Sequence, residues 1–195
     1  SGLWDEGLVL ASLRLIMDRH MGRPPETIVF EGRALSPQQF LGDVLRLDLD
    51  RYVSVVSTLS RPFYQPGGFE SQYNWWKGAD HYNVPLDRFG EVVRRCLSDG
   101  GTARLTVDVT DPGYSWGQNI AVVPEADLPP GYVTQQAREL RIHDASTADD
   151  HDVHAVGIAH LGDNDWFLIK DSYDLFRGGP PDYMLMRDDY LRLKV

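Results

Sequence analysis

Two short segments of this 195-residue chain carry side chains that suit acid–base chemistry. His151 precedes a stretch predicted as a strand, residues 153–160, and Asp171 directly follows a second predicted strand, residues 166–170. The Gly-Asp-Asn-Asp sequence of residues 162–165 is typical of a hairpin turn. Because a tight hairpin brings its two ends together, we expect His151 and Asp171 to lie side by side. A carboxylate that holds one ring nitrogen of an imidazole is what a histidine general base requires.

Other groups near His151 leave two alternatives open. His154 lies three residues further along the same strand, so its side chain points to the opposite face, where it is a second candidate for the functional histidine. A metal site is a further alternative, since hard cations bind clustered carboxylates; its candidate ligands are Asp149, Asp150, His151, Asp152 and His154. Strand alternation divides these side chains between two faces, however, and a solvated acidic turn is the simplest interpretation of residues 144–152.

Two further residues are candidate nucleophiles. Cys96, the single cysteine, falls on the apolar side of a predicted helix, which favours a buried structural role. One cysteine also excludes an internal disulfide framework and a zinc site built from cysteines. Ser1 would be the nucleophile of a self-processed hydrolase, but the helix-like sequence that follows it does not suit a strand-borne nucleophile.

The first half of the chain is predicted to be mostly helical. Apolar spacing predicts an amphipathic helix over residues 3–21, and Ser36 with Pro37 and Gln39 forms a capped helix start that continues to about Leu45. A strand over 53–59, an irregular segment over 61–82 and a helix over 85–98 follow. The irregular segment is rich in aromatic residues, which either line a peptide-binding cleft or pack on the core.

The second half is predicted to be a sheet or small barrel of antiparallel strands. Its other elements are a strand over 103–109, a loop over 111–130, a helix or loop over 134–143, a loop over 177–181, a strand over 183–186 and a strand-like end over 190–195. The fold class is therefore α+β, with a helical part over residues 1–100 and an antiparallel β part over 101–195. Because the chain begins at Ser1 and stops inside a strand-like pattern, we expect the natural protein to be longer.

Composition removes several classes of function. With 19 Lys and Arg against 29 Asp and Glu, the net charge is −10, which argues against a nucleic-acid partner because phosphate binding needs clustered basic side chains. No run of 18 apolar residues exists, so we expect no membrane span. Hydrophobic residues make up 42% of the chain, which is ordinary globular composition, and the cellular compartment stays open.

The segments around the His/Asp pair resemble the papain-like cysteine peptidases. Their histidine strand typically reads His-Ala-Val-x-Ala-Val-Gly and the next strand Tyr-Trp-Ile-x-Lys-Asn-Ser-Trp; here residues 151–157 read His-Asp-Val-His-Ala-Val-Gly and residues 165–173 Asp-Trp-Phe-Leu-Ile-Lys-Asp-Ser-Tyr. The aminopeptidase C and bleomycin hydrolase branch is the most similar. Its further motifs correspond, in order, to residues 24–27, 36–40, 84–109 and 183–190.

This resemblance implies a papain-like fold, of which the chain is the C-terminal, histidine-bearing half. The helical part over 1–100 and the β part over 101–195 would together belong to one larger catalytic unit. It implies His151 as the catalytic histidine, Asp171 as the orienting residue and Tyr173 as a shielding aromatic. It also implies a peptide substrate, aminopeptidase action, assembly into oligomers, and no metal or organic cofactor.

Three departures from the family pattern matter. Asp171 stands where the family has Asn, although a carboxylate also accepts from an imidazole N–H; Tyr173 replaces Trp. Nothing in the chain matches the family's Cys-Trp nucleophile or its oxyanion-hole glutamine, so the thiol is expected from another chain or a missing N-terminal segment. The alternative is a non-catalytic binding module on a peptidase scaffold.

Overall fold

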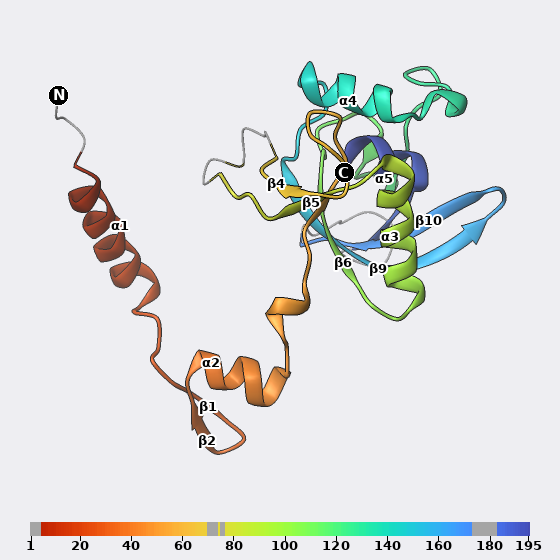
Figure 1. Ribbon diagram of the computed structural model, residues 1–195. Helices are drawn as coiled ribbons and strands as arrows, with labels where there is room; N and C mark the ends of the chain where they lie inside the picture. Colours follow the sequence, from red (N-terminus) through yellow and green to blue (C-terminus); the bar gives the residue numbers. More distant parts are fainter. Residues whose placement is uncertain (1–4, 70–73, 75–76, 173–182) are drawn as a thin grey trace. The chain divides into compact units, whose positions relative to one another are not determined.

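The computed structural model describes residues 5–69, 74, 77–172 and 183–195, and its contacts divide the chain into two compact units, Ser1–Tyr52 and Val53–Val195 (Figure 1). The division falls after residue 52 and not near residue 100. The reason is that helix α3 (Leu86–Ser98) buries its apolar face against the sheet of the second unit.

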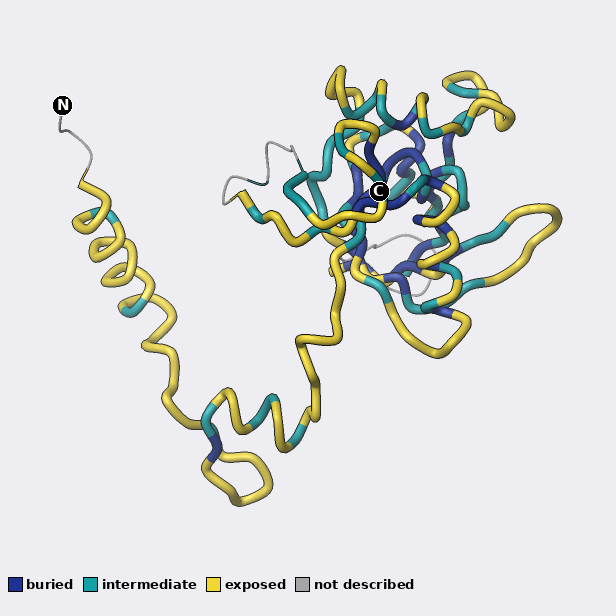
Figure 2. The backbone as a smooth tube through the Cα atoms, viewed as in Figure 1, coloured by how far each residue is buried: buried dark blue, intermediate teal, exposed yellow. Residues whose placement is uncertain are grey.

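The first unit consists of one 16-residue helix followed by shorter elements. In chain order they are α1 (Glu6–Met21), the β1 (Ile28–Phe30) and β2 (Arg33–Leu35) hairpin, α2 (Pro37–Gln39), the π-helical η1 (Phe40–Leu45) and the 3₁₀ helix η2 (Leu49–Arg51). The capped start at Ser36 is confirmed: its hydroxyl accepts from Gln39 N at 3.2 Å, and the Gln39 side chain accepts from Ser36 N at 2.9 Å. The expected helix at the N-terminus is present, but no residue of α1 is buried (Figure 2).

A six-stranded sheet organises the second unit. Its strand order is β6 (Ala103–Val107), β9 (His151–Leu161), β10 (Asn164–Lys170), β11 (Tyr183–Arg187), β8 (Ile120–Ala121) and β7 (Tyr114–Ser115). Neighbours run antiparallel, as expected, except that β11 and β8 are parallel. A smaller sheet pairs β5 (His81–Asn83) with β3 (Val55–Val56) and β4 (Pro66–Gly67), so the strand expected over 53–59 is shorter than predicted.

Helices cover this sheet and complete the core. Helix α3 contacts β6, β9 and α5 (Asp188–Lys194), and α5 also contacts α4 (Gln135–His143), β10 and β11; the 3₁₀ helix η3 (Pro130–Tyr132) precedes α4. Gly100, at φ 82°, reverses the chain after α3. The buried interior (Figure 2) includes Phe89, Val93, Val107, Phe167, Ile169, Met186 and Leu191.

Two expectations for the second half are wrong. The strand-like end over residues 190–195 is instead the helix α5, and the loop over 111–130 contains the short strands β7 and β8. Tyr190, Leu191, Leu193 and Lys194 are all buried, so α5 shows no amphipathic spacing, and its apolar residues alternate by chance as they would in a strand. Asp188 and Asp189 in its first turn are the helix signal, since acidic side chains favour a helix N-terminus.

No helix in the described part of the chain is both long enough and apolar enough to span a lipid bilayer.

Candidate active site

His151 and Asp171 are in contact. His151 is the first residue of β9, and Asp171 directly follows the last residue of β10. The Nε2 atom of His151 lies 2.8 Å from Oδ1 of Asp171. The His151 side chain is 28% exposed whereas the Asp171 side chain is fully buried, so the imidazole reaches solvent and the carboxylate anchors it from inside.

A bulge in β9 fixes the face to which His151 points. Leu168 pairs with Gly157 but Ile169 pairs with Ala155, so β9 carries one extra residue, Val156. Side chains alternate along a strand, and a bulge resets that alternation. Ala155 therefore faces the core on one side of the bulge and Ile158 on the other, and His151 shares the core-facing side with Ala155.

Hydrogen bonding fixes the tautomer of His151. A carboxylate only accepts, so Nε2 of His151 must carry a hydrogen and donate it to Asp171. That leaves Nδ1 as the nitrogen that accepts or releases a proton in the neutral ring. Among the residues that the structure describes, Nδ1 makes no hydrogen bond.

Sequence reasoning missed two aromatic residues beside the pair, Tyr114 and Trp116. The hydroxyl of Tyr114 donates to Oδ2 of Asp171 at 3.1 Å, and the Trp116 ring lies edge-on to His151 with 6.4 Å between centroids. Burial, the charge of Asp171 and this hydrogen bond together raise the pKa of Tyr114 far above its ordinary value, so the hydroxyl stays protonated as a donor. The only signal in the sequence was the aromatic pair spaced by two within the Gly-Tyr-Ser-Trp-Gly run of residues 113–117.

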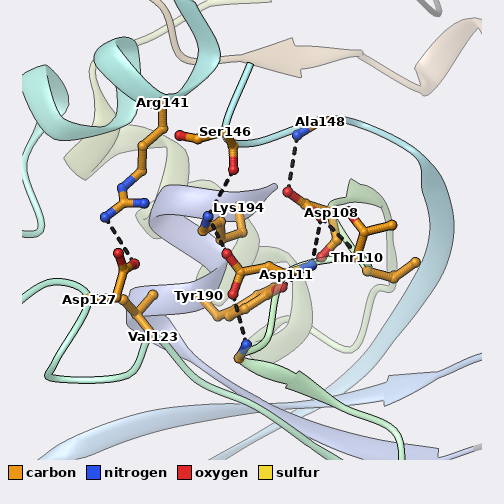
Figure 3. Close-up of polar contacts among 12 residues, drawn as sticks. Asp108, Thr110, Asp111, Val123, Asp127, Arg141, Ser146, Ala148, Tyr190 and Lys194 are labelled. Atoms are coloured by element: carbon orange, nitrogen blue, oxygen red, sulfur yellow. Dashed lines mark hydrogen bonds and ion pairs between the residues drawn. The ribbon is translucent and has the colours of Figure 1, made fainter. Parts of the chain in front are cut away.

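A buried polar network holds the turn before Tyr114 (Figure 3). The Lys194 ammonium, only 1% exposed, lies 2.6 Å from Oδ2 of Asp111, whose Oδ1 accepts from Gly113 N at 2.8 Å. Asp108 accepts from Asp111 N at 3.1 Å through its carboxylate, and its carbonyl accepts from the Tyr190 hydroxyl at 2.7 Å. Helix α5 therefore fixes the backbone that leads into β7.

The neighbouring polar residues have other partners. His154 is exposed, as strand alternation predicts. Asp150 accepts from Val109 N at 3.0 Å, and Asp152 accepts from Arg104 and Thr106. Although burial raises the pKa of Asp152, these two donors hold it below its ordinary value. In the described ranges, no three His, Cys, Asp or Glu side chains are placed to bind a metal ion.

The remaining candidates have different outcomes. Cys96 is half-buried near the end of α3, with its sulfur 3.5 Å from Thr102 O, so it is less enclosed than expected. Some candidates lie outside the described residues: Ser1, Tyr173, residues 177–181, and residues 70–73, 75 and 76 of the aromatic-rich segment over 61–82.

Comparison with known proteins supports the fold. PepW from Lactobacillus rhamnosis superimposes on 96% of this chain with a TM-score of 0.76 at 18% sequence identity. The matched region is 46% of the PepW chain, so this chain spans about half of its length. No family model and no curated protein matches the sequence. The likeness shows that this chain shares the α+β fold of the matched part of PepW.

Proposed function

We propose that this chain is the histidine-bearing half of a papain-like cysteine peptidase of the aminopeptidase C and bleomycin hydrolase type. The observation that carries the proposal is the 2.8 Å contact between Nε2 of His151 and the buried Asp171, which leaves Nδ1 for proton transfer. The fold likeness to PepW is consistent with it. The nucleophilic cysteine comes from an N-terminal domain or a separate chain, since Cys96 lies half-buried on α3 with its sulfur directed to a backbone carbonyl.

In this mechanism Nδ1 of His151 takes the proton of the incoming thiol, giving a thiolate and an imidazolium. The thiolate attacks the carbonyl carbon of a peptide bond, and the carbonyl oxygen becomes an oxyanion. As the carbon–nitrogen bond breaks, Nδ1 donates its proton to the leaving amine and a thioester remains. His151 then takes a proton from water, whose oxygen attacks the thioester carbon. As the carbon–sulfur bond breaks, the acid is released and the sulfur leaves as a thiolate, to which Nδ1 returns the proton.

Asp171 acts through His151 in each step. Its buried carboxylate keeps the hydrogen on Nε2 and holds the ring with Nδ1 outward. It also stabilises the imidazolium that forms twice in the cycle, because hydrogen bonds between charged groups are stronger than neutral ones.

The test is thiol labelling of the full-length protein that contains this sequence. An epoxysuccinyl peptide, which alkylates activated thiolates, should form an adduct on a cysteine outside these 195 residues. His151→Gln should lower the labelling rate about 10²–10⁴-fold, the usual contribution of a general base. His154→Gln is the matched control, because His154 is exposed on the opposite face of the same strand, and it should label at the wild-type rate.

An adduct on Cys96 alone, or equal labelling of the His151→Gln and wild-type proteins, contradicts the proposal. Absence of any adduct, together with saturable binding of peptides, is the result expected of the alternative, a non-catalytic peptidase-like binding module.

A further inference from the structure

Both oxygens of Asp171 have a defined donor. Oδ1 accepts from His151 Nε2 at 2.8 Å and Oδ2 accepts from the Tyr114 hydroxyl at 3.1 Å. A carboxylate accepts equally well at both atoms, whereas an amide has one oxygen and one donating nitrogen. Whether residue 171 is aspartate or asparagine therefore affects the hydrogen bonds of both His151 and Tyr114.

We propose that Tyr114 is a positioning residue for His151, and that its hydroxyl is the reason this site needs aspartate and not asparagine at position 171. The catalytic meaning of this inference rests on the proposed function, but the coupling itself is a property of this chain.

The hydrogen bonds with His151 and Tyr114 decide how an amide at position 171 would be oriented. If Asn replaced Asp171 while Tyr114 kept its hydroxyl, one orientation of the amide would satisfy both Tyr114 and His151: the amide oxygen accepts from Tyr114 and the amide nitrogen donates to Nε2. In that orientation Nε2 has become an acceptor, so the hydrogen moves to Nδ1. The opposite orientation keeps the hydrogen on Nε2 but leaves the buried Tyr114 hydroxyl without an acceptor, which is unfavourable.

Tyr114 has little freedom to avoid this choice. It is 4% exposed, its ring contacts Trp116 at 4.8 Å and Tyr190 at 5.9 Å between centroids, and its backbone pairs with Ala121 in β8. The Asp111–Gly113 hydrogen bond fixes the turn before it. The hydroxyl therefore stays directed at residue 171.

Removal of the hydroxyl should release the amide. In Tyr114→Phe/Asp171→Asn, the Tyr114 hydroxyl no longer holds the amide oxygen away from His151, so the oxygen can again accept from Nε2. Tyr114→Phe alone should leave the hydrogen on Nε2, because the Asp171 carboxylate still accepts it.

The test is the tautomer of His151, measured by two-bond ¹H–¹⁵N correlation spectra of this chain with the imidazole neutral. His151→Gln assigns the signal. We expect Nε2–H in wild type and in Tyr114→Phe, Nδ1–H in Asp171→Asn, and a return to mainly Nε2–H in the double variant. Tyr190→Phe/Asp171→Asn is the matched control, since Tyr190 is a buried tyrosine whose hydroxyl donates to Asp108 O, and it should stay Nδ1–H.

Several results would overturn the inference. These are Nδ1–H in the wild type, an unchanged Nε2–H in Asp171→Asn, or the same tautomer in Asp171→Asn and the double variant. The wild-type spectrum decides one of them even if a variant fails to fold. In the active peptidase, the same four proteins should show a loss in kcat at Asp171→Asn that Tyr114→Phe partly restores, with KM little changed. A clean tautomer series without any peptidase activity would refute the proposed function and leave the coupling intact.

Discussion

Replacement of Lys194 by Met should strongly destabilise the Val53–Val195 unit. Lys194 is 1% exposed, and its ammonium lies 2.6 Å from Asp111 Oδ2 and 3.4 Å from Ser146 O (Figure 3). Met keeps most of the apolar volume but leaves the Asp111 carboxylate, 12% exposed, without its counter-charge. Breaking a buried ion pair on one side costs about 3–5 kcal/mol of unfolding free energy.

The second substitution isolates the charge. Asp111→Asn keeps a carbonyl oxygen that accepts from Gly113 N, a hydrogen bond of 2.8 Å, while it removes the negative charge. Lys194→Met/Asp111→Asn therefore buries no unpaired ion and should recover at least about 2 kcal/mol of the loss, as expected for coupled partners in a double-mutant cycle.

Urea unfolding followed by tryptophan fluorescence measures this, since all the tryptophans except Trp4 lie after residue 52. With an m-value of about 2 kcal/mol per M, a loss of about 4 kcal/mol moves the midpoint down by about 2 M. Lys170→Met is the control, because Lys170 is exposed on β10, and its midpoint should stay near that of the wild type. A wild-type midpoint for Lys194→Met, or no recovery with Asp111→Asn, would refute the reasoning.

Two further predictions concern the same region. Burial raises the pKa of Tyr190 and Tyr114 far above the ordinary value of 10.0, so as the pH rises the unfolded chain loses these protons before the folded chain does. The two tyrosines therefore contribute fully to the unfolding free energy below pH 10. Above pH 10 that free energy falls by up to about 1.4 kcal/mol per pH unit for each tyrosine. Burial lowers the pKa of Arg138 to about 10, so here the folded chain loses the proton first, and this one group partly offsets the effect of the two tyrosines. Urea midpoints measured above pH 10 should therefore fall less steeply with pH in Tyr190→Phe than in wild type. Gly113→Ala would put a Cβ 2.0 Å from a backbone carbonyl oxygen across the β7–β8 pair, and should lower the unfolding free energy by about 1–3 kcal/mol. Gly117→Ala meets nothing within 4 Å, so an equal loss in both variants, measured by urea unfolding, would contradict this steric account.

The contact between His151 and Asp171 was predictable because it depends on local signals. A Gly-containing turn at 162–165 joins two alternating stretches, and β pairing then brings their outer ends together. The α+β class and the helices at 6–21 and 86–98 were predictable for the same reason. Helix ends and apolar spacing are patterns among residues close together in the sequence.

What sequence reasoning missed depends on contacts between distant segments. Tyr114 lies 57 residues before Asp171, and β7 and β8 are two residues each, too short to show alternation. The bulge at Val156 could not be predicted from the sequence either. A bulge is an extra residue in one strand relative to its partner, so it is defined by the pairing of β9 with β10 and not by the sequence of β9 alone.

The missed helix α5 and the missed Tyr114 have one physical cause. Both are buried by distant parts of the chain. A buried segment has no polar face, so its sequence lacks the alternation of polar and apolar residues from which a helix or strand is predicted. Lys194 illustrates this: a lysine in a sequence predicts an exposed position, yet here its charge is compensated inside the fold by Asp111. Asp111 in turn holds Gly113, and the next residue directs its hydroxyl to Asp171. Because Lys194 reaches Asp111 from helix α5, the contacts that orient the candidate catalytic histidine depend in part on a helix that the sequence pattern did not predict.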